Sequence, residues 1–420
     1  MLNPYIAHII SSSQSIMAEW PSSLEVFRPN GRIPQTGDLF RQTDLAETIG
    51  RMCDAERKTT GDRVRGLQSA HDDFYLGETA QRIAAFYSEQ GGFLTLSDLA
   101  AIDVPIESAK EVRVHGHRFF AGGVWGQGVS FLQALRMLEH ADIASMRHNS
   151  AEHIHLLVEV TKIVAADREL YCGDPNYVGD ATAMLLSAEY TDRRRALLSP
   201  TTALSWPQYS DPTAALPRSY VGEGDNYATT YLGVADRWGN VFAATPSDGS
   251  RHGPVVPGTG LSPSGRGATS TTLEGHPAEV MPGKRPRMMT GPLFAKLSDG
   301  RHMTFGSPGA DTQMQANIQF LCNHLLFGMD LQSAVEAPRF SSFGFPGSFA
   351  PQAIKPQVVK VEESIPAATR DALATKGHIV EAWADRAWMA GSVSAVVHQP
   401  TTGLYQAAAD PRRMAYGIAG

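Results

Sequence analysis

Two adjacent threonines, Thr229 and Thr230, stand where an apolar stretch begins, just after a polar, acidic segment. A hydroxyl is a poor nucleophile unless a base adjoins it, and a threonine at a chain N-terminus can use its own α-amine as that base. An internal threonine acquires such an amine if the chain cleaves itself immediately before it. Threonine is also common in strands, so β-propensity is the simpler explanation of the pair taken alone.

The residues around the two threonines predict a β-hairpin. Residues 227–235 alternate as a strand, and residues 241–245 continue as a return strand. Asp236 and the Gly239-Asn240 pair supply the side chains that tight turns favour. The threonines would therefore open the first strand of the hairpin.

The rest of the chain predicts helices first and then a mixture of strands and helices. Apolar residues recur at helical spacing over several segments, and alternation indicates strands in others. The helices are expected over 46–53, 80–87, 97–100, 129–140, 151–170 and 313–328, and the strands over 112–120, 392–399 and 403–408. This order is typical of an α/β protein with layered sheets.

Other candidate sites are weaker. A Gly-rich loop over 121–128 precedes a helix, but it lacks the Gly-Lys-Ser/Thr ending of a phosphate-binding loop. His115 and His117 share a face of the expected strand, whereas His153 and His155 diverge on the expected helix. Neither pair has a third ligand at metal spacing, so we expect surface or core histidines and no metal or organic cofactor.

Acidic pairs are interpreted as solvated faces or helix caps. These are Asp72-Asp73, the run from Asp167 to Asp174, and Glu362-Glu363. No Gly-x-Ser-x-Gly motif indicates a serine hydrolase elbow.

Composition excludes several classes of protein. The 420 residues are 42% hydrophobic and 19% charged, with a formal net charge of −7, which does not suggest nucleic acid or an anionic membrane as a partner. No run of apolar residues is long enough to span a membrane, and the N-terminal segment does not read as a signal peptide. The three cysteines exclude a disulfide framework and leave one bridge open. We expect a soluble protein, cytoplasmic or periplasmic.

The segment TTYLGVADRWGN, followed by VFAATPSDGS, resembles the start of the small subunit of γ-glutamyltransferases (glutathione hydrolases). Further segments agree in the same order over essentially the whole chain: GGFLTLSDLA, VTKIVAADRELYCGDP, VVPGTGL, PGKRP and FGSPGA. The resemblance implies an N-terminal nucleophile hydrolase with an αββα sandwich, made as a precursor that cuts itself. It places the nucleophile at Thr229 and the cut between Ala228 and Thr229.

The implied cut divides the chain into a mainly helical, large-subunit-like segment, 1–228, and a small-subunit-like segment, 229–420. The two fragments are expected to remain partners in one globular domain. Ser247 falls where the family has a threonine whose hydroxyl bonds the nucleophile. Gly309 and Ala310 fall where the family has a Gly-Gly pair whose amides form the oxyanion hole.

Three positions depart from the family at the expected substrate site. The resemblance places Met288 and Met289 where γ-glutamyl enzymes have two serines that hold the substrate α-carboxylate. It places either Arg266 or Gly267 where an acidic residue would bind the α-amino group. Arginine favours carboxylate partners, although an exposed loop cation explains Arg266 equally well. We therefore expect an amide donor with an anionic or apolar acyl group.

The family's large subunit also begins well upstream of the segment NPYIAHII, so the chain is expected to be incomplete at its N-terminus and to lack core strands, which a partner chain could supply. The sequence thus predicts an N-terminal threonine amidohydrolase or acyltransferase. The alternatives are an authentic glutathione hydrolase and an inactive relative that serves as a partner subunit.

Overall fold

The computed structural model describes residues 1–205, 207–211, 229–248 and 253–420. They form two compact units, Met1–Ile106 with Asp248–Gly265, and Glu107–Ser247 with Arg266–Gly420. Each of the two segments expected from the implied cleavage therefore contributes to both units. The cut itself stays a prediction, and Ala228 lies outside the described residues.

The first unit is helical. Its helices are α1 (Pro4–Ser12), α2 (Gln14–Met17), α3 (Pro21–Phe27), α4 (Thr43–Lys58), α5 (Arg63–Tyr75), α6 (Glu78–Glu89) and α7 (Leu96–Ala100), with a 3₁₀ turn at Pro29–Gly31. The short helix expected over 97–100 corresponds to α7, and Thr95 and Asp98 form a reciprocal capping box at its start.

The distant segment Asp248–Gly265 is bound into this helical unit by specific contacts. The Thr48 hydroxyl of α4 donates to the Thr259 carbonyl at 2.9 Å. Gly260 has φ 64°, and a Cβ there would lie 2.4 Å from the backbone nitrogen of Leu45, so only glycine fits against α4.

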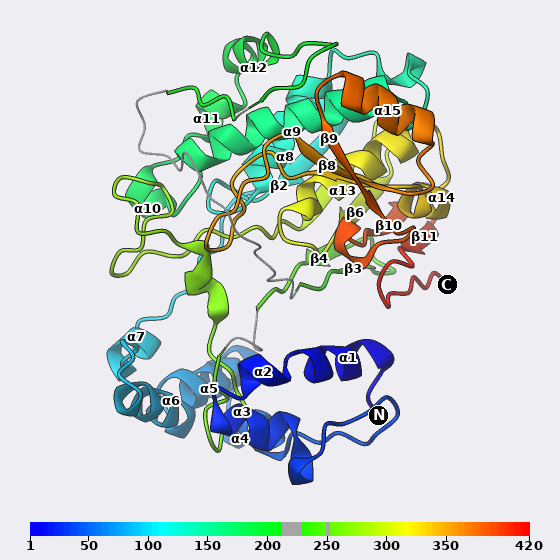
Figure 1. Ribbon diagram of the computed structural model, residues 1–420. Helices are drawn as coiled ribbons and strands as arrows, with labels where there is room; N and C mark the ends of the chain where they lie inside the picture. Colours follow the sequence, from blue (N-terminus) through cyan, green and yellow to red (C-terminus); the bar gives the residue numbers. More distant parts are fainter. Residues whose placement is uncertain (206, 212–228, 249–252) are drawn as a thin grey trace. The chain divides into compact units, whose positions relative to one another are not determined.

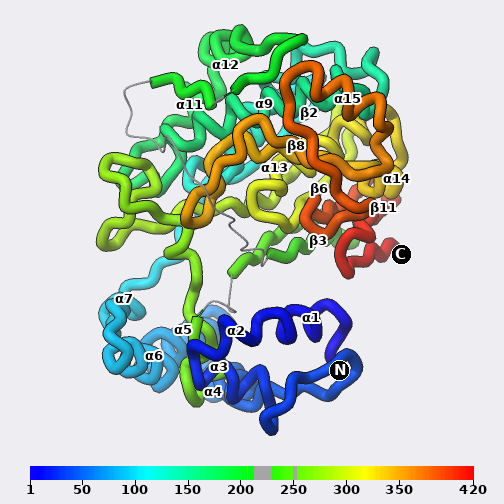
Figure 2. Tube along the Cα trace, in the orientation of Figure 1, coloured from blue at the N-terminus to red at the C-terminus, as the bar shows by residue number. Residues whose placement is uncertain are grey.

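The second unit is built on a six-stranded antiparallel sheet (Figure 1). Its strands, in spatial order, are β1 (Lys110–Val114), β2 (His117–Ala121), β5 (Leu293–Lys296), β6 (His302–Gly306), β10 (Ser394–Gln399) and β11 (Leu404–Ala409). The Cα trace in Figure 2 shows strands from the C-terminal end of the chain, in red, beside β6, in yellow, with which β10 pairs.

The two faces of β6 carry different layers, because successive side chains of a strand point to opposite sides. Phe305 packs on Phe131 and Phe320, which belong to α8 (Gly128–Leu138) and α13 (Thr312–Leu321). Thr304 points to the other face, where its hydroxyl forms a hydrogen bond of 2.9 Å with the Tyr231 hydroxyl. Tyr231 lies just before β3 (Leu232–Ala235). Strand β3 pairs with β4 (Val241–Ala244) as a two-stranded ribbon, and both strands contact β6.

Helices, the six-stranded sheet and the ribbon are thus three successive layers of the expected αββα sandwich, and the predicted α+β layered fold class is confirmed. The long helix α9 (Ala151–Tyr171) packs on α8, on α15 (Ala367–Thr375) and on a smaller sheet. That sheet consists of β7 (Phe340–Ser342), β8 (Val358–Glu362) and β9 (Ile379–Trp383). The remaining helical elements are α10 (Pro175–Val178), α11 (Thr182–Leu185), α12 (Ala188–Arg195), α14 (Leu331–Glu336) and short turns at Ile143–Ser145, Gly265–Thr269 and Trp388–Ala390.

Two expected elements differ from the structure. The single strand expected over 112–120 is wrong, because His115 (φ 49°) and Gly116 (φ 78°) form a two-residue turn between β1 and β2. Both central residues having positive φ is typical of a type I′ hairpin. The helix expected over 313–328 is α13 followed by a π-helical turn at Cys322–Leu326.

The three cysteines are free thiols, so the bridge left open by the sequence does not form. Among the described residues, none of the helices is both long and apolar enough to cross a membrane.

Candidate active site

Thr229 and Ser247 face each other at the open end of the β3–β4 ribbon. Leu232 pairs with Ala244 in the ribbon, and the same register carried outward pairs Thr229 with Ser247 as an antiparallel bridge. Their side-chain oxygens, Oγ1 and Oγ, lie 2.7 Å apart. The hydroxyl partner expected for the nucleophile is thus in contact with it.

Local sequence fixes this register. The Asp236 carboxylate accepts backbone hydrogen bonds from Trp238 and Asn240 at 2.9 Å, and Gly239 takes a positive φ of 85°. The turn residues expected from the sequence therefore form the turn. A register shifted by one residue would turn Ser247 away from Thr229.

Tyr231 holds the start of the ribbon against the sheet. Its hydroxyl lies 2.9 Å from the Thr304 hydroxyl, and a Cβ on Gly306 would lie 2.3 Å from its ring. Burial raises the pKa of Tyr231, so the phenol stays neutral. Thr229 is half-buried and Thr230 exposed, which fits a reactive first threonine and a neighbour that does not enter the site.

Arg266 lies against Ser247 rather than open to solvent. Its Nε donates to the Ser247 carbonyl oxygen at 3.1 Å, and its Nη2 donates to the Ser247 Oγ. The guanidinium carbon lies 5.4 Å from the ring centre of Phe349, and the residue is 8% exposed. The interpretation of Arg266 as an exposed loop cation is therefore wrong, because a contact with a residue 19 positions away has no local sequence signal. The role as a carboxylate anchor stays a prediction.

Gly309 and Ala310 form the turn between β6 and α13. Gly309 has φ 127° and Ala310 φ 49°, and a Cβ on Gly309 would lie 2.4 Å from the Thr312 Oγ1. Within the described part of the chain, neither backbone N–H donates to a protein acceptor. Two adjacent unpaired N–H groups at a turn are what an oxyanion hole requires.

Ala310 belongs to the same cluster as two residues beside Arg266. Met289, Ala310 and Phe349 are buried together, with Ala268 packed against them. Met289 therefore packs in the same cluster as Phe349, the ring that lies against the Arg266 guanidinium. Met288 is half-buried, and its N–H donates to the Trp125 carbonyl at 3.0 Å.

Asp311, which the sequence did not single out, ties the Gly309–Ala310 turn to α9. Its Oδ1 accepts from Arg168 Nη1 at 2.5 Å and from the Ser348 hydroxyl at 2.6 Å. Its Oδ2 accepts from the Ser348 N–H at 2.8 Å. Because Ser348 precedes Phe349, the same carboxylate holds both the turn and the aromatic ring under Arg266.

The family model for gamma-glutamyltranspeptidase matches residues 1–419. The chain belongs to the gamma-glutamyltranspeptidase family. The resemblance drawn from the sequence is confirmed across the whole chain.

Curated relatives of this family member include acylases and glutathione hydrolases. Acylase ACY 1 proenzyme of Pseudomonas sp. (strain SE83) is 29% identical over 412 residues, covering 97% of this chain and 66% of the relative. Glutathione hydrolase proenzyme of Bacillus subtilis (strain 168) is 29% identical over 352 residues, covering 80% of this chain and 57% of the relative. The chain thus spans roughly three fifths of the length of these relatives.

Two solved structures share the fold over nearly the entire chain. LmbA2991HD matches with a TM-score of 0.89 and 33% identity, covering 98% of this chain and 74% of that one. Cephalosporin acylase from Bacillus halodurans matches with a TM-score of 0.83 and 26% identity, covering 100% of this chain and 71% of that one.

The family segment around Arg168 binds Arg287, the residue directly after the PGKRP segment, in the interior. Glu169 accepts from Arg168 and from Arg287, each at 2.8 Å, and is 1% exposed. Burial alone would raise the pKa of Glu169, but Arg287 and Arg168 outweigh it and hold the pKa well below its usual range.

The interpretation of the acidic pairs as solvated faces or caps is therefore wrong for Asp167, Glu169 and Glu362, which are buried with arginine partners. It is right for Asp174, whose side chain caps α10. Pairing across distant segments, rather than exposure, compensates the buried charges.

A buried trio of His155, Glu159 and His378 is the one group among the described residues that could hold a metal ion. Its donors already have partners: His155 Nδ1 lies 2.8 Å from His378 Nε2, and His155 Nε2 lies 2.7 Å from the Ser199 carbonyl. The Lys162 ammonium lies 2.5 Å from a Glu159 oxygen and supplies the positive charge. The trio therefore fits an internal hydrogen-bond cluster better than a metal site.

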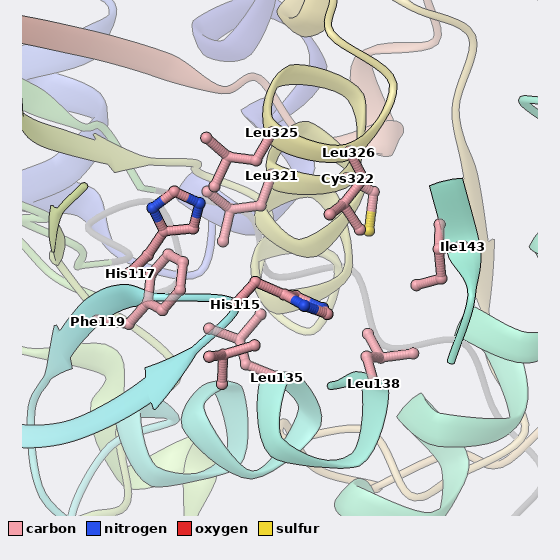
Figure 3. Close-up of a pocket in the computed structure, with 11 residues that line it drawn as sticks. His115, His117, Phe119, Leu135, Leu138, Ile143, Leu321, Cys322, Leu325 and Leu326 are labelled. Carbon is pink, nitrogen blue, oxygen red and sulfur yellow. The ribbon is translucent and has the colours of Figure 1, made fainter. Parts of the chain in front are cut away.

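A small apolar pocket lies away from these residues, between the β1–β2 hairpin, α8 and the π-helical turn (Figure 3). His115 and His117 stand at one side, and Leu321, Cys322 and Leu325 at another. Its volume is about 40 Å³. None of the candidate catalytic residues lines it, so it belongs to the packing of the core rather than to the site.

Proposed function

We propose that the chain is an N-terminal threonine amidohydrolase or acyltransferase that cleaves itself before Thr229. The observation that carries the proposal is the 2.7 Å contact between Thr229 Oγ1 and Ser247 Oγ. It joins the Thr229 hydroxyl, which lies just before β3, to a second hydroxyl at the position where the resemblance to the family places its partner.

In the precursor, Thr229 Oγ1 attacks the carbonyl carbon of the preceding peptide bond. The C–N bond breaks, the acyl group passes to oxygen, and the hydroxyl proton passes to the nitrogen, which becomes the free α-amine. Water then hydrolyses the ester, which leaves residues 1–228 and 229–420 as separate fragments. These steps of self-cleavage need no cofactor.

In turnover, the freed α-amine accepts the Thr229 hydroxyl proton while Oγ1 attacks the carbonyl of an amide donor. The proton passes to the leaving amine, and an acyl ester forms on Thr229. Water or a second amine then takes the acyl group. The unpaired N–H groups of Gly309 and Ala310 would bind the oxyanion of each tetrahedral intermediate.

The donor is proposed to lack an α-amino group. Met289 packs with Ala310 and Phe349, so this position is apolar where the family resemblance expects a serine. Arg266 is a cation and cannot replace an acidic residue that binds an α-ammonium group. The resemblance to an acylase and to a cephalosporin acylase supports an acyl donor of this kind. An authentic glutathione hydrolase is the alternative that the glutathione hydrolase relatives favour.

Intact-mass spectrometry of the denatured protein tests the nucleophile. The wild type is expected to give two fragments, the second beginning at Thr229, whereas Thr229→Ala stays whole and Thr230→Ala is cut. An uncut wild-type chain would contradict self-cleavage. It would favour the alternative that the chain is an inactive family member that serves as a partner subunit.

Three p-nitroanilides then test the donor. The γ-glutamyl compound carries an α-amino group and a carboxylate, the glutaryl compound only the carboxylate, and the pentanoyl compound neither. We expect the γ-glutamyl compound to have the lowest kcat/KM. A preference for it, or for glutathione, would overturn the proposed donor class but not the nucleophile.

A further inference from the structure

We propose that Arg266 is a positioning residue for Ser247, and through Ser247 for the nucleophile. In this arrangement the guanidinium orients the Ser247 hydroxyl so that it donates to Thr229 Oγ1. The inference rests on the proposed function of Thr229 and adds a third residue to its hydrogen-bond chain.

The geometry allows the Thr229–Ser247 hydrogen bond to run in either direction, since both partners are hydroxyls. Arg266 removes this symmetry. Guanidinium has only donors and stays charged, so the contact of Nη2 with Ser247 Oγ must use a lone pair of the serine. The cation repels the hydroxyl hydrogen of Ser247, which therefore points away from Arg266. Thr229 Oγ1 lies 2.7 Å from Ser247 Oγ and can accept that hydrogen.

This direction matters for the reaction. When Ser247 donates to Oγ1, the Thr229 hydroxyl hydrogen is left to point at the α-amine that must accept it. A hydroxyl that bonds to a cation is also a stronger donor, so it stabilises the negative charge that develops on Oγ1 during attack.

Several contacts hold Arg266 in place for this role. Its Nε donates to the Ser247 carbonyl at 3.1 Å, so two donors of one planar group bind one residue. The Phe349 ring lies under the guanidinium at 5.4 Å, and the Thr269 hydroxyl donates to the Arg266 carbonyl at 2.7 Å. Phe349 follows Ser348, which Asp311 holds through two hydrogen bonds.

The position of Arg266 in the chain supports the same role. The chain leaves the second unit after Ser247 and re-enters it at Arg266, with Asp248–Gly265 bound into the helical unit. The Arg266–Ser247 hydrogen bonds therefore join the last residue before the chain leaves the second unit to the first residue after it returns. Ser247 is therefore held by its own strand on one side and by Arg266 on the other.

A double-mutant cycle tests the proposal, with Arg266→Met, Arg266→Lys, Ser247→Ala and the double variant Ser247→Ala/Arg266→Met. Arg237→Met is the matched control, because Arg237 also stacks on an aromatic ring, 4.4 Å from Trp238, but lies in the hairpin turn. The rate of chain cleavage is followed by intact mass. For cleaved protein, kcat and KM are measured with the glutaryl and pentanoyl p-nitroanilides.

We expect Arg266→Met to lower the cleavage rate and kcat by about tenfold to a hundredfold, with KM of both donors within about twofold of wild type. Arg266→Lys should recover part of the loss, because it keeps the charge but not the planar pair of donors. In the Ser247→Ala background, Arg266→Met should have little further effect. Arg237→Met should behave as wild type.

Three results would overturn the proposal: full activity of Arg266→Met, a KM increase confined to the glutaryl donor, or equal effects of Arg266→Met with and without Ser247. The second would make Arg266 a carboxylate anchor. If the thermal transition shows that Arg266→Met is unfolded, the effect of Arg266→Lys is measured instead, with and without Ser247→Ala. An uncut wild-type chain would instead refute the proposed function, and this inference with it.

Discussion

Thr229 and Ser247 are paired twice, once through a backbone bridge and once through their hydroxyl oxygens. The side-chain contact follows from the backbone register, because directly opposite residues of an antiparallel pair place their side chains on the same face. The separation of the two residues along the chain is therefore as much a part of the site as their chemistry.

Two substitutions of Ser247 distinguish the role of its hydroxyl in the reaction from its role in the fold. Ser247→Ala removes the hydrogen bond to Thr229 and should slow cleavage and acylation by about tenfold to a hundredfold. Ser247→Thr restores the hydroxyl that the family carries there and should stay within a few-fold of wild type. Time courses of intact mass measure both, and equal rates for the alanine and threonine variants would contradict a role for the hydroxyl.

The Gly309–Ala310 turn predicts opposite outcomes for two small substitutions. Gly309→Ala places a Cβ 2.4 Å from the Thr312 hydroxyl at φ 127°, so we expect a loss of stability of about 2 kcal/mol or more and little cleavage. Ala310→Gly relieves an alanine at φ 49° and keeps the N–H, so it should change stability by about 1 kcal/mol at most. Urea unfolding and intact mass give both values, and an active, stable Gly309→Ala variant would refute the strained turn.

Replacing Asp311 should lower the free energy of unfolding more than replacing its partner Ser348. Asp311→Asn leaves the buried Arg168 with Glu169 as its remaining carboxylate, so we expect a loss of roughly 3 kcal/mol. Ser348→Ala removes one donor to the same carboxylate and should cost about 1 kcal/mol. Chemical denaturation of the two variants checks this order, which equal losses would contradict.

Acid should destabilise the protein through buried histidines. Burial, with a smaller effect of His148, lowers the pKa of His153 to about 4, whereas an unfolded histidine has a pKa near 6.5. The unfolded chain therefore binds the proton first as pH falls below 6.5, and stability is lost from there down to about pH 4.

Between pH 7 and pH 5, His153 alone should reduce the free energy of unfolding by about 2 kcal/mol. His153→Asn is the matched variant, because its Oδ1 can accept the Asn149 N–H that His153 Nδ1 accepts at 3.2 Å. Urea titrations at the two pH values should show a weaker pH dependence for the variant. An unchanged dependence would assign the loss to other groups, such as His378, whose pKa burial also lowers, to about 3.

Local sequence signals predicted the parts of the site that short-range interactions build. The Asp236 and Gly239-Asn240 turn, the return strand and the helix that begins at Ala151 were found where expected, whereas the first strand begins at Leu232 rather than at the threonines. The β1–β2 hairpin was missed, because alternation of side chains continues through its two-residue turn and a histidine at positive φ gives no turn signal.

The partners of buried charged groups could not be predicted in this way. Arg168 and Asp311 are 143 positions apart, and no periodicity links them. The sequence by itself determined the turn and the two strands of the hairpin, since these depend on interactions over a few residues. It indicated Ser247 as the partner of Thr229 only through the resemblance to the family, and the register of the folded hairpin brings the two together. Only the tertiary structure decided that Arg266 would bond to Ser247 rather than face solvent, because that choice depends on which distant side chains share a desolvated interior.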